Sequence, residues 1–321
     1  MSGCRICENT FGNKSYVARE MMFGYRDEFG YFECAKCGCL QIEHIPEDLS
    51  KYYPENYYSF KHLDCSRDNF LKSYLRHQKA KYSLHGNNFL GAILSKVYGT
   101  PEYYQWLKRA SVGFDSEILD VGCGTGGLLL RMQPQGFVKL TGADPYIEHD
   151  IFYKNGVKVL KRDVDEINQQ FDFIMLHHSF EHIADPLPML KELHRILRQG
   201  GYLLIRIPVA SSYAWRTYGV DWVQLDAPRH LFLHTPKSIK LLATQSGFQL
   251  EDVVFDSTDF QFWGSEQYIK GVHLMDENSL YIENPKASIF SKGQIRSFRK
   301  RAMELNEVGD GDQACFYLHK N

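Results

Sequence analysis

Short apolar runs alternate with segments of helical spacing through the central part of the chain. The runs read ILDV (118–121), LTGAD (140–144), VKVLKRD (157–163), FDFIMLHH (171–178) and YLLIRIP (202–208). Runs of this length and composition are typical of buried parallel strands. Residues 185–198 place leucines at helical spacing, and the glycine pair that follows them predicts the end of a helix. The alternation predicts a doubly wound parallel sheet, which binds ligands at the carboxyl ends of its strands.

The flanking segments carry other patterns. Residues 49–59 hold four tyrosines and a proline, which predicts an extended aromatic connector, and residues 69–97 show helical spacing. Two further strands are expected at 248–255 and 314–320. Between them lies an insertion, residues 257–313, with an aromatic start and a basic helix.

Four cysteines near the start of the chain form two C-x-x-C pairs, Cys4 with Cys7 and Cys34 with Cys37. Two such pairs supply four thiolates for a tetrahedral zinc site. Residues 23–34 alternate aromatic and polar side chains, as the hairpin of a zinc ribbon does. Four cysteine ligands leave no open coordination position, so we expect the zinc ion to stabilise the module rather than to catalyse a reaction.

Two other interpretations of these cysteines are open. Cys39 follows Cys37 after one residue and offers an alternative zinc ligand. A disulfide framework competes with zinc, but the single occurrences of Cys65, Cys123 and Cys315 in a cytosolic chain argue against it. Two paired spacings within so short a segment also argue against ordinary buried thiols.

The segment EILDVGCGTGGLLL (117–130) joins a predicted strand, a glycine-rich turn and the start of a helix. Glycines let the backbone approach a ligand, and the free N–H groups of a helix start favour an anionic group. Gly122, Gly124 and Gly127 satisfy the dinucleotide pattern G-x-G-x-x-G, and Asp144 lies near the distance of a ribose-binding acid. The glycines alone therefore leave a dinucleotide site open.

Four motifs in register resemble those of class I S-adenosylmethionine (SAM) methyltransferases, namely LDVGCGTG, GADP, KRDV and FDFIMLHHSFEHIADP. The last is followed by LKELHRILRQGGYLLI, and the resemblance covers roughly residues 111–256 plus the final strand. It implies a Rossmann-like, doubly wound α/β fold with a seven-stranded sheet and SAM as the methyl donor. The SAM-binding positions that it implies are Asp120, Gly122, Cys123, Gly124, Gly126, Asp144, Pro145, Asp163, Val164 and His177.

The resemblance also assigns roles to the acids. An acid ends the first strand, here Asp120, and the glycine turn after it holds the methionine end of SAM. The acid after the second strand, Asp144, binds the ribose hydroxyls, and the acid after the third, Asp163, lies by the adenine. An ionised carboxylate accepts strong hydrogen bonds from a diol or an amine. Asp144 and Asp163 can instead serve as helix caps or turn residues.

The cysteine module joined to this domain resembles a narrower group, bacterial methyltransferases that act on sugars and nucleotide-linked sugars in polysaccharide biosynthesis. Some sugar C-methyltransferases of that group carry a histidine after the fifth strand, preceded by an acid and a tyrosine. His230 matches that histidine, whereas Ala227 and Arg229 stand where the tyrosine and the acid would be. Transfer to a hydroxyl and transfer to a carbon therefore stay equally open.

Three histidines follow predicted strands at the carboxyl edge of the sheet and are candidate catalytic bases. His178 and His182 come after the fourth strand, and His230 comes after the fifth. Histidine titrates near neutral pH, which suits the removal of a proton from an acceptor hydroxyl. Glu181 is a candidate to orient a histidine or to bind the acceptor. Each histidine can also serve only in packing or capping, His182 above all in the EH-x-x-DP turn.

Three segments are expected to close over this edge and form the acceptor site: residues 52–58, 215–230 and 260–268. Flat aromatic faces beside polar groups suit a sugar, although the same aromatics can serve only to pack the insertion. We divide the chain into a zinc-ribbon-like module (1–48), an aromatic connector with helices (49–110) and a SAM-binding domain (111–321) with an inserted capping segment at about 257–313.

Composition narrows the class of protein. The 321 residues are 44% hydrophobic and 24% charged, as in ordinary globular proteins. No apolar run approaches the ~20 residues that cross a bilayer, and no apolar signal-peptide core is present, which favours a cytoplasmic protein without a membrane partner. A net charge of −2 disfavours nucleic acid, with the basic run at 296–301 as the local exception.

The sequence thus predicts an enzyme that transfers a methyl group from SAM to a hydroxyl or carbon of a small sugar-containing acceptor. Two alternatives remain. One is an RNA-modifying methyltransferase that docks RNA through the zinc module, and the other is a non-catalytic SAM-binding protein whose zinc ribbon binds a protein partner.

Overall fold

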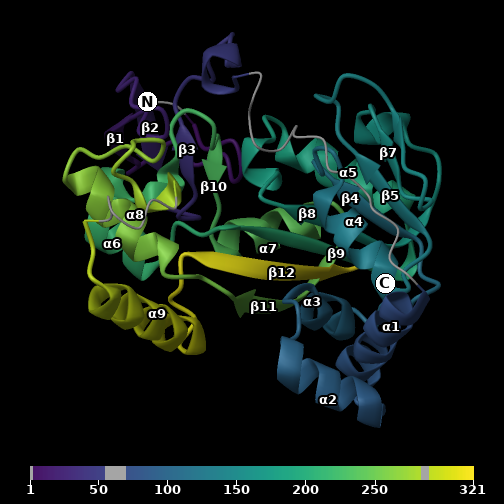
Figure 1. The fold of residues 1–321 in the computed structure, drawn as a ribbon. Helices are drawn as coiled ribbons and strands as arrows, with labels where there is room; N and C mark the ends of the chain where they lie inside the picture. The colour runs from purple at the N-terminus through teal and green to yellow at the C-terminus, as the bar shows by residue number, and fades with distance from the viewer. Residues whose placement is uncertain (1–2, 55–69, 283–288) are drawn as a thin grey trace.

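The computed structural model describes residues 3–54, 70–282 and 289–321, and its largest element is an eight-stranded sheet (Figure 1). The strands lie in the order β11-β12-β9-β8-β4-β5-β7-β6. Their bounds are β4 (Ile118–Val121), β5 (Leu140–Ala143), β6 (Ile151–Phe152), β7 (Lys158–Leu160), β8 (Phe171–His177), β9 (Leu197–Pro208), β11 (Gln249–Phe255) and β12 (Gln313–His319). The run from β9 to β7 is parallel, and β12 pairs antiparallel with both β9 and β11. The predicted α/β fold with a mainly parallel sheet is confirmed.

The sheet has one strand more than the seven that the resemblance implies. Strand β6 pairs antiparallel with β7 through Ile151 opposite Val159 and Phe152 opposite Lys158. An edge strand of two residues is too short to produce a periodic hydrophobic pattern. The extra strand therefore could not be predicted from the sequence.

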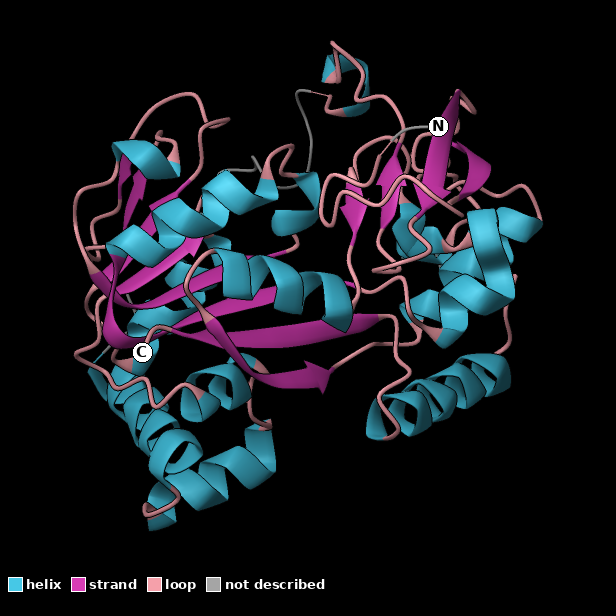
Figure 2. Ribbon diagram, turned by 180° about the vertical axis from the view of Figure 1, so that it is seen from behind, coloured by secondary structure: helices cyan, strands magenta, loops and turns pink. Residues whose placement is uncertain are grey.

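The central strands are buried on both faces, and β8 shows the arrangement. Ile174 and Leu176 belong to one hydrophobic core, whereas Phe173 and Met175 point to the other. The first core includes side chains from α5 (Pro186–Ile196) and α7 (Pro236–Gln245), and the second includes side chains from α1 (Phe70–His85), α3 (Tyr103–Arg109) and α4 (Gly127–Met132). Figure 2 shows helices on either side of the sheet. Burial on both faces explains why these strands read as continuous apolar runs.

The stretch of helical spacing at 69–97 forms two helices rather than one. Helix α1 ends at His85, and Gly86 follows with a φ of 74°. Helix α2 (Phe89–Tyr98) begins after Asn88, whose side chain accepts a hydrogen bond from the Gly91 N–H at 2.7 Å. None of the described helices is long and apolar enough to span a membrane. Residues 55–69 of the predicted connector lie outside the described part of the chain.

A second, four-stranded sheet joins the N-terminal segment to the central domain. It has the order β1-β2-β3-β10, with β1 (Lys14–Arg19), β2 (Glu28–Glu33), β3 (Leu40–Ile42) and β10 (Phe232–Leu233). Strands β1 and β2 form a hairpin, but it begins earlier than predicted, because only β2 lies within residues 23–34 and its partner β1 precedes that range. Strand β10 follows directly on the loop that carries His230. The N-terminal module is therefore continuous with the edge of the candidate site.

The described part of the insertion between β11 and β12 contains the α-helices α8 (Phe260–Ile269) and α9 (Lys292–Glu307) and the 3₁₀ helix η8 (Leu280–Ile282), and residues 283–288 are outside the described ranges. The aromatic start of the insertion is helix α8. Its Ser265 hydroxyl accepts a hydrogen bond from the Val223 N–H at 3.0 Å. The insertion therefore packs on the loop that leads to His230.

Candidate active site and cysteine cluster

Glycines form the turn after β4 at positions that a side chain would block. Gly122, Gly124 and Gly126 have φ values of 72°, 54° and 83°. A Cβ added at Gly122 would lie 2.5 Å from the Cβ of Ser179, the second residue after β8. The Ser179 hydroxyl donates to the Val121 carbonyl at 2.9 Å. The glycine turn and the segment after β8 are therefore in direct contact.

Asp144 follows β5 and holds the same turn in place. Its carboxylate accepts the N–H of Gly124 at 2.8 Å and the N–H of Tyr146 at 2.9 Å. The residue is 6% exposed, and burial raises its pKa. Each carboxylate oxygen can accept a further hydrogen bond, so this geometry fits the predicted contact with a ribose diol.

Asp120 is buried at the end of β4. Burial, followed by the negative charge of Asp144, raises the pKa of Asp120 to about 8, and Arg131 opposes the shift. The carboxyl group is therefore largely protonated at neutral pH. Beside it, the Cys123 side chain faces β5, where a Cβ on Gly142 would lie 2.4 Å from Sγ.

The remaining predicted SAM-binding positions lie at the ends of neighbouring strands, with Pro145 half-buried after β5. Asp163 is exposed and forms a capping box with Glu166 of the 3₁₀ turn η4 (Val164–Glu166). This is the capping role that the sequence left open, and it keeps Asp163 at the predicted edge. His177 ends β8 and lies against Trp106, with ring centroids 4.3 Å apart. Burial holds the pKa of His177 well below its usual value.

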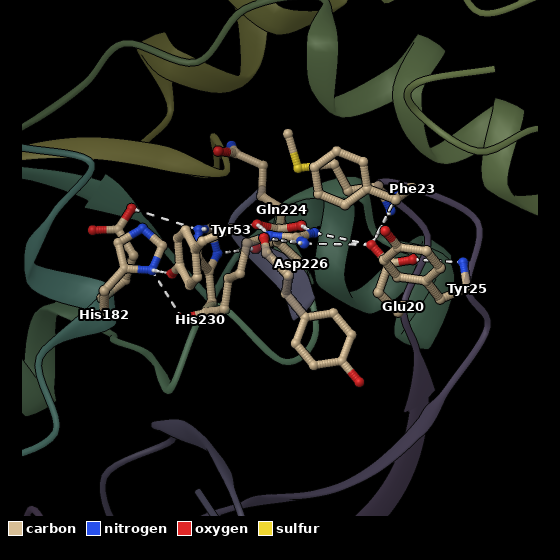
Figure 3. Close-up of polar contacts among 12 residues, drawn as sticks. Glu20, Phe23, Tyr25, Tyr53, His182, Gln224, Asp226 and His230 are labelled. Atoms are coloured by element: carbon tan, nitrogen blue, oxygen red, sulfur yellow. Dashed lines mark hydrogen bonds and ion pairs between the residues drawn. The ribbon is translucent and has the colours of Figure 1, made fainter. Parts of the chain in front are cut away.

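Glu181, His182 and His230 meet at the carboxyl edge of the sheet, and Figure 3 shows the two imidazoles side by side. One nitrogen from each ring and one Glu181 oxygen all lie within 4.8 Å of one another. Nε2 of His230 is 3.8 Å from Oε1 of Glu181, and the two ring centroids are 4.9 Å apart. The turn η5 (Phe180–His182) starts directly after Ser179, so this cluster lies beside the glycine turn.

Main-chain carbonyls fix the orientation of both imidazoles. Nδ1 of His182 is 2.8 Å from the Arg229 carbonyl, and Nδ1 of His230 is 2.7 Å from the Gln224 carbonyl (Figure 3). Because a carbonyl only accepts, each Nδ1 carries a hydrogen, and Nε2 of the neutral ring is then the nitrogen with the lone pair. Burial lowers the pKa of His230 to about 4, although the nearby Asp226 carboxylate opposes the shift.

Glu181 is fully buried, and neither carboxylate oxygen has a hydrogen-bond partner among the described residues. Burial alone would raise its pKa, but the imidazoles of His178, His182 and His230 lower it to about 2. The cluster therefore contains an ionised carboxylate beside two imidazole rings.

Both ring nitrogens of His178 already have neighbours. Nε2 accepts a hydrogen bond from Arg206 Nη1 at 3.0 Å, which leaves the hydrogen on Nδ1, and Nδ1 is 3.5 Å from Glu181 Oε1. The backbone of His178 is left-handed, with a φ of 50°. This placement suits a residue that orients Glu181 better than one that takes a proton from the acceptor.

A buried ion-pair network links the N-terminal module to the His230 loop. Arg229 pairs with Glu20 at 3.4 Å and with Asp226. Glu20 in turn accepts the N–H groups of Met22, Phe23 and Tyr25 (Figure 3). Sequence reasoning missed Glu20 and Asp226 and treated Arg229 only as a departure from a family pattern. The position of Arg229 next to the candidate catalytic His230 was the one signal in the sequence that could have suggested this network.

The four predicted zinc ligands come together. Sγ of Cys4 is 3.6 Å from Sγ of Cys37, Sγ of Cys7 is 3.5 Å from Sγ of Cys34, and all four lie within 4.8 Å of one another. Thiolates at about 2.3 Å from one tetrahedral zinc ion are about 3.8 Å apart, so the cluster fits that ion. Cys39 is outside this group, with its sulfur 3.9 Å from His234 Nδ1.

Two of the three segments expected around the acceptor are in contact, and the described end of the third reaches the same place. In addition to the Val223–Ser265 bond, the Tyr218 hydroxyl donates to Glu266 at 3.2 Å. The Tyr53 hydroxyl lies 3.2 Å from Nδ1 of His182. Residues 55–58 of this third segment lie outside the described ranges. Tyr53 and the 215–230 loop therefore border the histidine cluster, and residues 260–268 pack on that loop.

Comparison with known proteins identifies the class. Residues 95–253 match the model of a methyltransferase domain family. A ubiquinone biosynthesis O-methyltransferase of Pseudomonas aeruginosa (strain LESB58) is 25% identical in an alignment of 173 residues that covers 48% of this chain and 73% of that protein. A tRNA U34 carboxymethyltransferase of Campylobacter fetus is 26% identical over 188 residues, 54% of this chain and 65% of that protein. Among solved structures, a SAM-dependent methyltransferase from Archaeoglobus fulgidus is 19% identical with a TM-score of 0.40, over 73% of this chain and 100% of that one.

The chain thus contains a class I methyltransferase domain, and the protein is a SAM-dependent methyltransferase. SAM binding is expected of this fold, and the glycine turn with Asp144 fits that ligand.

Proposed function

We propose that the protein transfers the methyl group of SAM to a hydroxyl group of a small polar acceptor, with sugar-containing compounds as the acceptor class. The observation that carries this proposal is the cluster of Glu181, His182 and His230 beside the glycine turn. Two imidazole lone pairs and a carboxylate are gathered there at the carboxyl edge of the sheet. A class I methyltransferase binds its ligands at this edge.

Methyl transfer to oxygen has two chemical requirements. The acceptor oxygen must lie in line with the bond between the methyl carbon and sulfur, and its hydroxyl proton must leave. The new C–O bond forms as the C–S bond breaks, and the electron pair of the broken bond stays on sulfur. The cluster supplies groups for the proton, and we infer that the segment around Tyr53, which contacts His182, helps to position the acceptor.

Two further observations support a hydroxyl over a carbon. Arg229 occupies one of the two positions that accompany the histidine in sugar C-methyltransferases, and it is fully buried in pairs with Glu20 and Asp226. Because its guanidinium is engaged in these buried ion pairs, Arg229 does not contact an acceptor. The similarity to an O-methyltransferase of ubiquinone biosynthesis points in the same direction. The assignment of sugars rests on the sequence resemblance alone.

RNA is the second candidate acceptor, because a tRNA-modifying enzyme is among the similar proteins and α9 is basic. Several of the cations on α9 have acidic partners, however. Arg299 pairs with Asp259 at 2.7 Å, and Lys300 and Arg301 both lie near Glu304. These two carboxylates reduce the positive charge that α9 offers to a phosphate backbone but do not cancel it.

The test is to incubate the purified protein with SAM carrying a labelled methyl group and with fractionated cell extract. We expect label in a pool of low molecular weight that contains sugar hydroxyls. A Gly122→Val variant is the control without label, because its side chain would collide with Ser179. Label in RNA would establish the second candidate, and no label in any pool would refute the proposed reaction.

A further inference from the structure

We propose that Glu181, His182 and His230 form a binding site for a divalent first-row transition-metal ion, which activates the acceptor hydroxyl. The activating role rests on the function proposed above, whereas the metal site itself does not. This site is separate from the cysteine cluster in both position and ligand type.

The three donor atoms are close enough to share one ion. They lie within 4.8 Å of one another, and the pair from Glu181 and His230 is 3.8 Å apart. Three ligands at about 2.1 Å from one tetrahedral or octahedral ion are about 3.0–3.4 Å apart. The Glu181–His230 pair is within about an ångström of that spacing, and the widest pair of the group would have to close by up to about 1.5 Å through side-chain rotation.

Both histidines are held as metal-ligating histidines usually are. A ligating imidazole typically donates its other ring N–H to a carbonyl or carboxylate, which fixes its tautomer and orientation. His182 and His230 each make such a bond, to the carbonyls of Arg229 and Gln224. The Nε2 lone pairs of both rings are therefore available before any ion arrives.

Glu181 supplies an independent observation. Its side chain is 0% exposed, and neither oxygen has a hydrogen-bond partner in the described part of the chain. The nearest nitrogens are His178 Nδ1 at 3.5 Å and His230 Nε2 at 3.8 Å, both too far for good hydrogen bonds. A buried carboxylate without such a bond is costly, and a cation held by Glu181 and the two imidazoles removes the cost.

The donor set indicates the kind of ion and its role. Two imidazoles with one carboxylate suit borderline ions such as Zn²⁺, Fe²⁺, Co²⁺ and Ni²⁺. Three protein ligands also leave coordination positions open, as in catalytic rather than structural sites. The acceptor hydroxyl would take one of those positions.

Such an ion would lower the pKa of the bound hydroxyl, as it does for bound water. The hydroxyl proton leaves to solvent, the oxygen forms its bond to the methyl carbon, and the electron pair of the broken C–S bond stays on sulfur. His230 then acts as a ligand rather than as the base. His178, held by Arg206, is the positioning residue behind Glu181.

The test uses Co²⁺ as the probe, because its visible spectrum distinguishes thiolate from nitrogen and oxygen ligands. The full-length protein is purified with its zinc retained and titrated with Co²⁺. We expect one Co²⁺ per chain without a thiolate charge-transfer band and without zinc release. The Glu181→Gln and His182→Ala variants should bind at least about tenfold more weakly.

The matched control is His77→Gln, because His77 also makes an Nδ1 contact with a main-chain carbonyl, that of Gln135 at 3.0 Å, but lies in no cluster. It should bind Co²⁺ as the unaltered protein does. Circular dichroism and zinc content show whether each variant has folded. Failure of the unaltered protein to bind Co²⁺, or equal binding by a folded Glu181→Gln variant, would overturn the site.

Methyl transfer tests the role of the ion separately. A chelator should remove the metal from the site of Glu181, His182 and His230 under conditions that keep the cysteine-bound zinc. The rate of methyl transfer should then fall at least about tenfold, and added Co²⁺ should restore it. Full transfer without the ion would overturn the activating role and return the base to His230. If Co²⁺ binds as expected but no pool accepts label, the proposed reaction fails while the metal site stands.

Discussion

The guanidinium of Arg229 lies 3.4 Å from the carboxylate of Glu20, and both side chains are fully buried although 209 positions separate them. Arg229 immediately precedes His230, whereas Glu20 closes the turn after β1. One ion pair thus ties the N-terminal module to the loop that carries a candidate catalytic side chain. The module therefore supports the site as well as folding around its cysteines.

We expect Arg229→Ala to destabilise the protein by about 3–5 kcal/mol, because it leaves the Glu20 and Asp226 carboxylates buried without their cation. The control is Arg216→Ala, which removes an ion pair with Asp310. The Arg216 side chain is 55% exposed, so its loss should lower the free energy of unfolding by at most about 1 kcal/mol. Urea denaturation gives both values. Equal stability of the two variants would contradict the role of the buried pair.

The cysteine cluster should hold one zinc ion per chain. Metal analysis of protein purified without chelator should find it, and Cys34→Ser should lose both the metal and thermal stability, since metal binding contributes to folding. Cys39→Ser should keep the zinc, because that sulfur lies outside the cluster. Zinc in Cys34→Ser equal to that in the unaltered protein would show that the cysteines do not hold it.

Local sequence patterns were sufficient to predict the parallel strands, the glycine turn and the grouping of the four cysteines. The apolar runs predict the parallel strands because each is buried on both faces. The glycine turn is recognisable because strand, turn and helix are consecutive in the chain. The two C-x-x-C pairs could be assigned to one site because thiolates at such spacing have few other uses.

What the sequence could not show are contacts set by the tertiary fold. Nε2 of His230 lies 3.8 Å from Glu181, and carbonyls of Gln224 and Arg229 hold Nδ1 of His230 and of His182. Every residue has a main-chain carbonyl, so the sequence does not show which carbonyl a given histidine will contact. The same holds for β10, a two-residue strand whose partner β3 lies about 190 positions earlier in the chain.

Stability should depend on pH through Asp120. Its pKa is raised from 3.8 to about 8 by burial and by the charge of Asp144, so the folded state holds its proton more tightly than the unfolded state. The stability that this proton contributes is complete below about pH 4 and is lost as pH rises to about 8. The difference in melting temperature, Asp120→Asn minus unaltered protein, should therefore increase between pH 5 and pH 8.5. A difference independent of pH would refute the shifted pKa.

His230→Ala should reduce methyl transfer by about 10²- to 10⁴-fold, the range for loss of a group that handles the acceptor proton. SAM affinity should stay within error, because the glycine turn and Asp144 make no contact with this side chain in the hydrogen bonds described. The measurement is initial rate with the labelled pool, with His77→Gln as the control histidine. Full turnover in His230→Ala would remove this residue from both the metal site and the base role.

Binding measurements should decide between SAM and a dinucleotide, the two ligands that the glycine turn alone permits, and Asp144 should contribute to the binding. Calorimetry should show binding of SAM and none of NAD, and Asp144→Ala should weaken SAM binding by about 1.5–3 kcal/mol, as expected for lost hydrogen bonds to a charged group. Part of that loss has a structural origin, because the carboxylate also holds the Gly124 and Tyr146 N–H groups. Asp144→Asn separates the two effects, since its amide oxygen still accepts from one of these donors while the charge is gone. Asn should therefore weaken SAM binding less than Ala does. Tight NAD binding without SAM binding would refute the cofactor assignment, because a methyl donor is then absent.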